Sequence, residues 1–315
     1  MHHCISILII AEHADAFNTG RKVLTADFTA VHPRAIIKDS FLVHPGPCLC
    51  FQPPVFRRHL ISGLHEKLKT APSGAPTKER NTMRVLFIGN SHTYFNDMPA
   101  LFARFCRASG TETEVTMLSH SGKPLEWHRS EYFEERFNLL HGGYDFCVIQ
   151  QQAHPFPEPK QSGETIGYLT GLCAAAHTLP VLYMTWAEKA CPENQKLMTE
   201  TYRQIAADTG ARLAPVGEAW ERVRSRHPEI ELYWRDGMHA SAYGSYLAAA
   251  VLFAAVTGKS PRNLPDTAID FSLESGLDLN NPAVLENPDQ VFVSPRPDWC
   301  AAIREAAAAC MEDEG

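Results

Sequence analysis

The chain has 315 residues, of which 44% are hydrophobic and 21% are charged, which is enough to bury a sizeable core in one large or two modest domains. Its formal net charge of -7 argues against nucleic acid as a main partner. The nine cysteines include no Cys-x-x-Cys pair, and no apolar run is long enough to span a bilayer or to make a convincing signal peptide. We therefore expect free thiols, a cytoplasmic location and no membrane partner.

The first 82 residues differ from the rest of the chain. They hold 7 of the 15 histidines, and their 10 Lys/Arg against 6 Asp/Glu leave a charge of +4, whereas the remainder carries -11. Their apolar residues keep no sustained strand or helix period, and residues 71–76 have the composition of a linker. Met83 stands directly before the first clear strand, as a start codon would. The sequence thus predicts that residues 1–82 are a disordered extension or a mis-assigned start, and that 83–315 form one domain.

The first clear pattern is a short buried strand over residues 85–89, apolar and closed by glycine. A helix should begin shortly afterwards, with Asp97 as N-cap, Pro99 in the first turn and an apolar face made by Leu101, Phe102 and Phe105. Ser91 therefore lies on a strand-to-helix turn, at the carboxyl edge of a sheet, where α/β proteins bind ligands. The alternative is an ordinary turn in which the serine only caps the helix.

Strand and helix patterns alternate from this point onward. Further strands are predicted at 115–118, 145–150, 181–186 and 211–215, and helices at 125–140, 163–177, 194–207, 218–224, 241–256 and 297–311. Within the helix over 125–140, the expected buried positions are Trp127, Phe133, Phe137 and Leu140. Such regular alternation predicts an α/β fold with a central parallel sheet and helices on both faces, and the last helix should pack on the same domain.

A carboxylate and an imidazole stand three residues apart late in the chain. Asp236 and His239 lie in a predicted loop just before the helix that opens near Ser241. A serine hydroxyl becomes a good nucleophile when a base takes its proton, and the base needs an orienting carboxylate. This spacing lets Asp236 reach the Nδ1–H of His239 and leaves Nε2 free to face Ser91. Taken alone, such a loop more often caps a helix, but its combination with a serine after a buried strand favours a catalytic set.

Three short motifs together resemble the SGNH/GDSL hydrolase superfamily. They are Gly89-Asn90-Ser91 after a strand, a glycine after the second strand, and Asp-x-x-His before a final helix. The resemblance runs from Met83 to about Pro265 and is most specific in residues 85–93 and 236–258. The Gly-x-Ser-x-Gly pentapeptide of α/β-hydrolases is absent, because Thr93 stands at the second glycine position. The resemblance implies a three-layer α/β/α fold of the flavodoxin-like kind.

The resemblance also implies roles for individual residues. Ser91 would be the nucleophile, His239 the general base and acid, and Asp236 the group that orients the imidazole. The oxyanion hole would combine the backbone N–H groups of Ser91 and Gly122 with a side-chain donor from the segment after the third strand.

That third segment departs from the family pattern, which usually has Gly-x-Asn-Asp. The chain has Gln150-Gln151-Gln152-Ala153-His154 instead. Counting places His154 on the asparagine position, whereas a glutamine amide is the better chemical substitute, so Gln152 is the first choice for the donor and His154 the second. Each glutamine could instead be a polar strand end that bonds neighbouring loops. Candidate substrate contacts near the triad are Asn90, His92, Gln151 and His154.

These residues favour a serine ester hydrolase that acts through an acyl-enzyme. Small acyl esters such as O-acetylated carbohydrates are the first substrate class to consider, by analogy alone, so the expected partner is a small-molecule ester. Two alternatives stay open: acyl transfer with the same triad, and a non-catalytic ligand-binding module. No His-Glu-x-x-His or other metal-ligand spacing is present, so we expect no metal and no cofactor.

Overall fold

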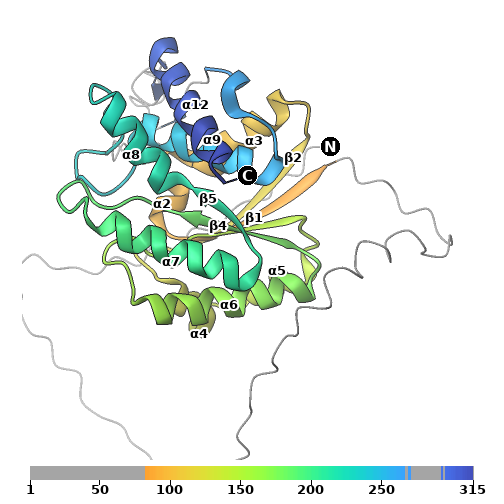
Figure 1. Cartoon of the computed structure of the whole chain (residues 1–315). Helices are drawn as coiled ribbons and strands as arrows, with labels where there is room; N and C mark the ends of the chain where they lie inside the picture. Colours follow the sequence, from red (N-terminus) through yellow and green to blue (C-terminus); the bar gives the residue numbers. More distant parts are fainter. Residues whose placement is uncertain (1–81, 267–268, 271–291, 294, 315) are drawn as a thin grey trace, which may run out of the picture. The chain divides into compact units, whose positions relative to one another are not determined.

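A parallel five-stranded sheet forms the centre of the fold (Figure 1). The computed structural model describes residues 82–266, 269–270, 292–293 and 295–314, so the predicted extension over 1–82 lies, but for Thr82, outside the described residues. The strands pair in the order β2-β1-β3-β4-β5, and their bounds are β1 Met83–Gly89, β2 Thr113–Ser119, β3 Phe146–Ile149, β4 Leu179–Met184 and β5 Arg212–Pro215. This sheet confirms the predicted α/β class, and its strand order is the flavodoxin-like one.

Strand β1, which pairs with β2 and β3, shows why the sheet is covered on both sides. Val85 and Phe87 belong to one buried cluster, whereas Leu86 and Ile88 belong to the other, and all four side chains are fully buried. Side chains of a strand alternate between the two faces, so a strand buried on both faces reads as a continuous apolar run. The short run before Ser91 therefore places the serine at the end of a strand that is buried on both faces.

Helices form one layer on each face of the sheet (Figure 1). One layer contains α3, α8, α9 and α12, and the other contains α4, α5, α6 and α7. The helical bounds are α2 Ser91–Tyr94, η1 Phe95–Asp97, α3 Met98–Ala108, α4 Leu125–Glu131, α5 Phe133–His141, α6 Pro159–Ala175, α7 Asn194–Thr209, α8 Val216–Arg226, α9 Ala242–Thr257, η2 Pro261–Asn263 and α12 Pro297–Glu312. A two-residue antiparallel pair, β6 Ile269–Asp270 with β7 Phe292–Val293, completes the described elements. In the described part of the chain, no helix is long and apolar enough to cross a membrane.

The predicted helix over 125–140 is two helices, and the expected burial of Phe133 and Phe137 is wrong. These side chains are 67% and 61% exposed, while Trp127 and Leu140 are only half-buried. Tyr132 has φ −108° and ψ 80°, which interrupts the helix between α4 and α5. The second helix therefore restarts at a different phase. The buried positions of the pair are Leu125, His128, Glu135 and Leu139.

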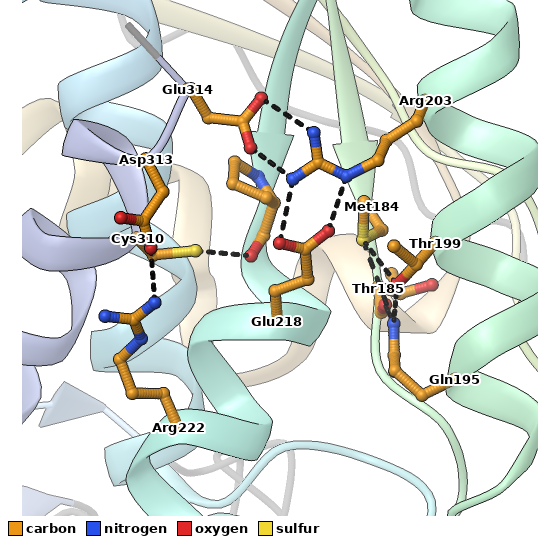
Figure 2. A network of polar contacts seen from close by, with 11 residues as sticks. Met184, Thr185, Gln195, Thr199, Arg203, Glu218, Arg222, Cys310, Asp313 and Glu314 are labelled. Carbon is orange, nitrogen blue, oxygen red and sulfur yellow. Dashed lines mark hydrogen bonds and ion pairs between the residues drawn. The ribbon is translucent and has the colours of Figure 1, made fainter.

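The last helix, α12, packs against α8 and α9 through buried residues that include Ile303 and Ala307. Figure 2 shows the polar contacts around its carboxyl end, where Arg203 of α7 donates to both carboxylate oxygens of Glu218 at 2.9 Å and also binds Glu314. Exposed ion pairs contribute at most about 1 kcal/mol each. The apolar face, rather than this network, is therefore the main attachment of α12.

Candidate active site

Ser91 lies where β1 passes into its helix. β1 ends at Gly89, Asn90 caps α2 by accepting the backbone N–H of His92 at 3.1 Å, and Ser91 is the first helical residue, 7% exposed. The order β2-β1-β3 makes this turn the switch point of the sheet, which is where α/β folds bind ligands. The predicted position of the serine at the carboxyl edge of a parallel sheet is thus the observed one.

Gln150, the residue after β3, holds this turn in place. Its Oε1 accepts the backbone N–H of Asn90 at 2.8 Å and the hydroxyl of Thr93 at 2.9 Å, and the side chain is 1% exposed. A Cβ on Gly89 would lie 2.3 Å from this same oxygen, so only glycine fits beside it. Gln150 therefore supports the turn, which is the alternative given above for these glutamines, a polar strand end that bonds a neighbouring loop.

The imidazole comes from a tight loop between α8 and α9. Within it, Gly237 adopts φ +73° and its N–H donates to the carbonyl of Trp234 at 2.9 Å, while the Trp234 N–H donates to the carbonyl of His239 at 2.8 Å. Ser241 then caps α9 by accepting the N–H of Gly244. The loop is thereby closed at its base, and Asp236 and His239 lie on the same short turn.

The structure brings the three predicted catalytic side chains into one series. Ser91 Oγ lies 2.8 Å from Nε2 of His239, and Nδ1 of His239 lies 2.6 Å from Oδ2 of Asp236. The other carboxylate oxygen accepts the backbone N–H groups of Met238 at 2.8 Å and His239 at 3.0 Å. Partial burial would raise the pKa of Asp236, but the hydrogen bonds from the imidazole and the two N–H groups outweigh it and lower the pKa. The carboxylate is therefore kept ionised beside the ring.

The loop after β2 is fastened against the serine turn. The N–H of His120 donates to the carbonyl of Gly89 at 3.1 Å, and the Asn90 amide donates to the carbonyl of Lys123 at 3.2 Å. Gly122, between these two anchors, is exposed and has φ +64°, a conformation that favours glycine. The second predicted motif therefore lies on a loop that is joined to the turn of Ser91, and the amide of Asn90, an expected substrate contact, is used to hold that loop.

Comparison with known proteins now decides the family. No family model and no curated protein matches the sequence. Among solved structures, a protein from Slackia heliotrinireducens described as a candidate SGNH hydrolase has 32% identity, over 56% of this chain and 100% of its own, with a TM-score of 0.49. The identity extends over the whole of that relative. The chain belongs to the SGNH hydrolases.

Two further solved structures are more distant relatives of this SGNH hydrolase. A DUF4886 family protein from Bacteroides uniformis has 18% identity over 73% of this chain and 95% of its own, with a TM-score of 0.52, which supports the fold alone. A catalytic mutant of an acetylxylan esterase from Geobacillus stearothermophilus has 16% identity over 56% of this chain and 94% of its own, with a TM-score of 0.45. That last likeness is too low to bear on substrate or mechanism here.

Gln151 lies inside the third segment and does not face a substrate. It is fully buried, its Oε1 accepts the N–H groups of Leu125 at 3.0 Å and Gln152 at 2.8 Å, and its Nε2 donates to Glu126 at 3.0 Å. An amide whose oxygen and nitrogen are both committed inside the protein cannot also bind a ligand. The expectation that Gln151 contacts substrate is therefore corrected: it ties the third segment to the start of α4.

Gln152 and His154, the two choices for the third oxyanion donor, are placed differently. The Gln152 amide donates to the carbonyls of His154 at 3.3 Å and Pro155 at 3.2 Å, within its own loop. The His154 ring lies 5.1 Å from the ring of His92, which in turn stacks on His239 at 5.0 Å. The side chain of His154, the second choice, therefore lies beside His92, whereas the amide of Gln152, the first choice, is used within its own loop.

His92 is a buried neutral imidazole behind the triad. It is 7% exposed, and its ring centroid lies 5.4 Å from that of Trp186. Burial, and then the neighbouring imidazoles of His154 and His239, lower its pKa well below the ordinary value. His92 therefore stays neutral beside the catalytic ring.

A second buried histidine supports the end of β1. Nε2 of His128 lies 2.9 Å from the carbonyl oxygen of Gly89, and Nδ1 lies 2.6 Å from a carboxylate oxygen of Glu135, with both side chains almost fully buried. The pair thus holds the backbone two residues before Ser91. Across the described ranges, no group of three or more His, Cys, Asp or Glu side chains is placed to hold a metal ion.

Two hollows differ in their relation to the triad. A cavity of about 510 Å³ is bordered by residues 153–156 of the third segment, by Glu188 and by Met238, the neighbour of His239. A larger hollow of about 720 Å³ lies at the start of β5, where Arg212 donates to backbone carbonyls at the end of α9. Because Arg212 begins β5, the larger hollow is at the amino edge of the sheet, away from Ser91. The smaller cavity is therefore the one beside the catalytic loop.

Proposed function

We propose that this SGNH hydrolase is a serine esterase that works through an acyl-enzyme. The observation that carries the proposal is the series of hydrogen bonds from Ser91 to His239 at 2.8 Å and from His239 to Asp236 at 2.6 Å. A hydroxyl, an imidazole and a carboxylate in this order are what activates a serine. A module that only binds a ligand has no need of such a series.

In this arrangement, His239 can accept and return each proton that the reaction transfers. Ser91 Oγ attacks the ester carbonyl carbon while its proton passes to Nε2 of His239, and the carbonyl electron pair moves onto the oxygen. When the tetrahedral intermediate collapses, the carbon–oxygen bond to the alcohol breaks and Nε2 returns the proton to that oxygen. Water then repeats the sequence on the acyl-enzyme. Asp236 faces the imidazolium in both halves of the reaction and balances its charge.

The oxyanion would be held by backbone N–H groups from two motifs. Ser91 is the first residue of α2, so its N–H has no acceptor within the helix. Gly122 lies on the loop that is fastened to the same turn, and a Cβ there would meet nothing within 4 Å, which leaves room for a ligand. Each such donor is worth roughly 10²–10³ in rate. His154, which lines the cavity beside Met238, is the side chain that we propose as a third donor.

A small acyl ester of a polar alcohol, such as an O-acetylated carbohydrate, is the substrate class that we propose. The cavity beside Met238, about 510 Å³, lies within the usual range of roughly 300–1,000 Å³ for small-molecule sites, and it combines apolar walls with the carboxylate of Glu188. The half-buried aromatic rings of Trp127 and Tyr132 stack on each other, with centroids 5.6 Å apart, in the segment that follows the Gly122 loop. Amphipathic rings of this kind pack against sugar faces while leaving hydroxyls to polar partners.

A fluorophosphonate probe tests the serine directly. We expect stoichiometric labelling of the full chain that disappears in Ser91→Ala and persists in Ser130→Ala, the matched control on an exposed face of α4. Turnover of p-nitrophenyl acetate should fall by several orders of magnitude in His239→Ala. Labelling that persists in Ser91→Ala, or near wild-type turnover by His239→Ala, would refute the assignment. A panel of acetylated sugars, short-chain esters and thioesters, with and without added sugar acceptor, then separates hydrolysis from acyl transfer.

A further inference from the structure

The imidazole of His239 lies between two other rings. Phe95 stacks on one face with ring centroids 4.2 Å apart and planes 12° from parallel, and His92 stacks nearby at 5.0 Å and 29°. The hydrogen bonds of His239 to Ser91 and Asp236 are made by its two ring nitrogens and lie in the plane of the ring. They therefore do not prevent the ring from rotating about the line through Nδ1 and Nε2. Stacked faces resist that tilt.

Phe95 owes its place to a reversal of the chain directly after α2. Asn96 and Asp97 have φ of 56° and 49°, left-handed values that few residues other than glycine adopt. The reversal buries Asn96 completely, and its amide donates to the carbonyls of Ala240 at 3.2 Å and Ser241 at 3.1 Å. Asn96, directly after Phe95, is thus hydrogen-bonded to the two residues that follow His239. These bonds connect the backbone segments that bear the two stacked rings.

Resting on the proposed esterase function, we propose that Phe95 is a positioning residue for the catalytic base. The aromatic face holds the imidazole of His239 at the tilt that points Nε2 toward the Ser91 hydroxyl, and it faces the positive charge that appears on the ring when the serine proton arrives. A cation over the face of an aromatic ring is attracted by the ring quadrupole. Phe95 therefore contributes more in the transition state than in the ground state, which is the condition for raising kcat.

The charged and titratable neighbours of His239 agree with this assignment. Asp236 is the acidic group at Nδ1, and the imidazoles of His92 and His154 are the basic groups nearby. Burial is the main cause that lowers the pKa of both neighbouring imidazoles, so neither carries a competing positive charge. The charge formed during the reaction is thus confined to the ring between Phe95 and His92.

The test compares Phe95→Leu, which removes the aromatic face and keeps most of the bulk, with Phe95→Tyr, which restores the face. Phe137→Leu is the matched control, because that ring is 61% exposed on α5. We expect kcat for an acetyl ester to fall by about 10-fold or more in Phe95→Leu with KM within twofold, since small misplacement of a catalytic group costs up to roughly 10²-fold. Phe95→Tyr should regain kcat to within about threefold of wild type, and Phe137→Leu should match wild type.

A second measurement separates the stacking from the chemistry. The NMR signals of the carbon-bound ring protons of His239 are assigned by their loss in His239→Ala. In wild-type protein the ring current of Phe95 should shift these signals upfield. Phe95→Leu should abolish that shift. Loss of the shift with kcat unchanged overturns the positioning role, as does a loss of kcat that Phe95→Tyr does not restore. If wild-type protein neither turns over esters nor reacts with fluorophosphonate, the esterase proposal itself fails, which this experiment shows as a separate result.

Discussion

The buried ring of His92 should make the folded protein sensitive to acid. The side chain is 7% exposed, and burial followed by the neighbouring imidazoles lowers its pKa well below 6.5, the ordinary value that applies in the unfolded chain. Below about pH 6.5 the unfolded chain therefore takes up a proton that the folded protein does not. The contribution of the neutral His92 to the free energy of unfolding is fully present above that pH. It is lost progressively as the pH decreases toward the lowered pKa of the folded state.

The size of the effect follows from the linkage between proton binding and unfolding. One histidine that stays neutral when folded lowers the free energy of unfolding by about 1.4 kcal/mol at pH 5.5 and by less than about 0.1 kcal/mol at pH 7.5. His92→Gln removes the titrating group. Its own loss of packing applies at both pH values, so the stability gap between wild type and His92→Gln should narrow by about 1.4 kcal/mol between pH 7.5 and pH 5.5.

Urea unfolding followed by tryptophan fluorescence at the two pH values measures this gap. Ser245→Ala is the control, because it removes a buried hydroxyl that accepts the Asn96 amide at 2.7 Å without removing a titrating group. Its stability deficit should be the same at both pH values, because it changes no titrating group. If wild type and His92→Gln lose stability in parallel as the pH falls, the reasoning about the buried imidazole is refuted.

Three further substitutions test the supports of the site. Asp236→Asn should lower kcat by about 10⁴ with little change in KM for the same ester, because an amide favours the wrong imidazole tautomer; a loss under tenfold would contradict the orienting role. Gln150→Leu should cost about 2–6 kcal/mol in urea unfolding, because two buried donors lose their acceptor; an unchanged midpoint would contradict this. Gly244→Ala should cost about 1–3 kcal/mol by the same assay, since its Cβ would lie 2.3 Å from the carbonyl of Leu232. Gly171→Ala on α6, where nothing lies within 4 Å, is the control that should show no loss.

Local patterns were sufficient for most of the strands and helices, because each depends on neighbours in the chain, whereas the roles expected of the site residues also needed the resemblance to a family. The apolar run that ends at Gly89 predicted a buried strand, and the alternation after it predicted the parallel sheet. Asp236 and His239 are three residues apart, so the spacing allowed their hydrogen bond, and the serine after a buried strand favoured it. The buried face of the helix over 133–141 could not be predicted from a local pattern. A single residue, Tyr132, has non-helical dihedral angles and so changes which face of the second helix lies against the core.

By itself, the sequence indicated most of the strands and helices in their order, a serine directly after the first strand, and a carboxylate and an imidazole three residues apart in one loop, since periodicity and spacing are properties of short segments. Tertiary structure alone decided that Ser91 and His239, 148 residues apart, come within 2.8 Å. It also decided which of three consecutive glutamines supports the turn and that Asn96 bonds the loop of the base. Such contacts join segments that are distant in the chain, and their geometry is set by how the layers pack on the sheet, which no local pattern records.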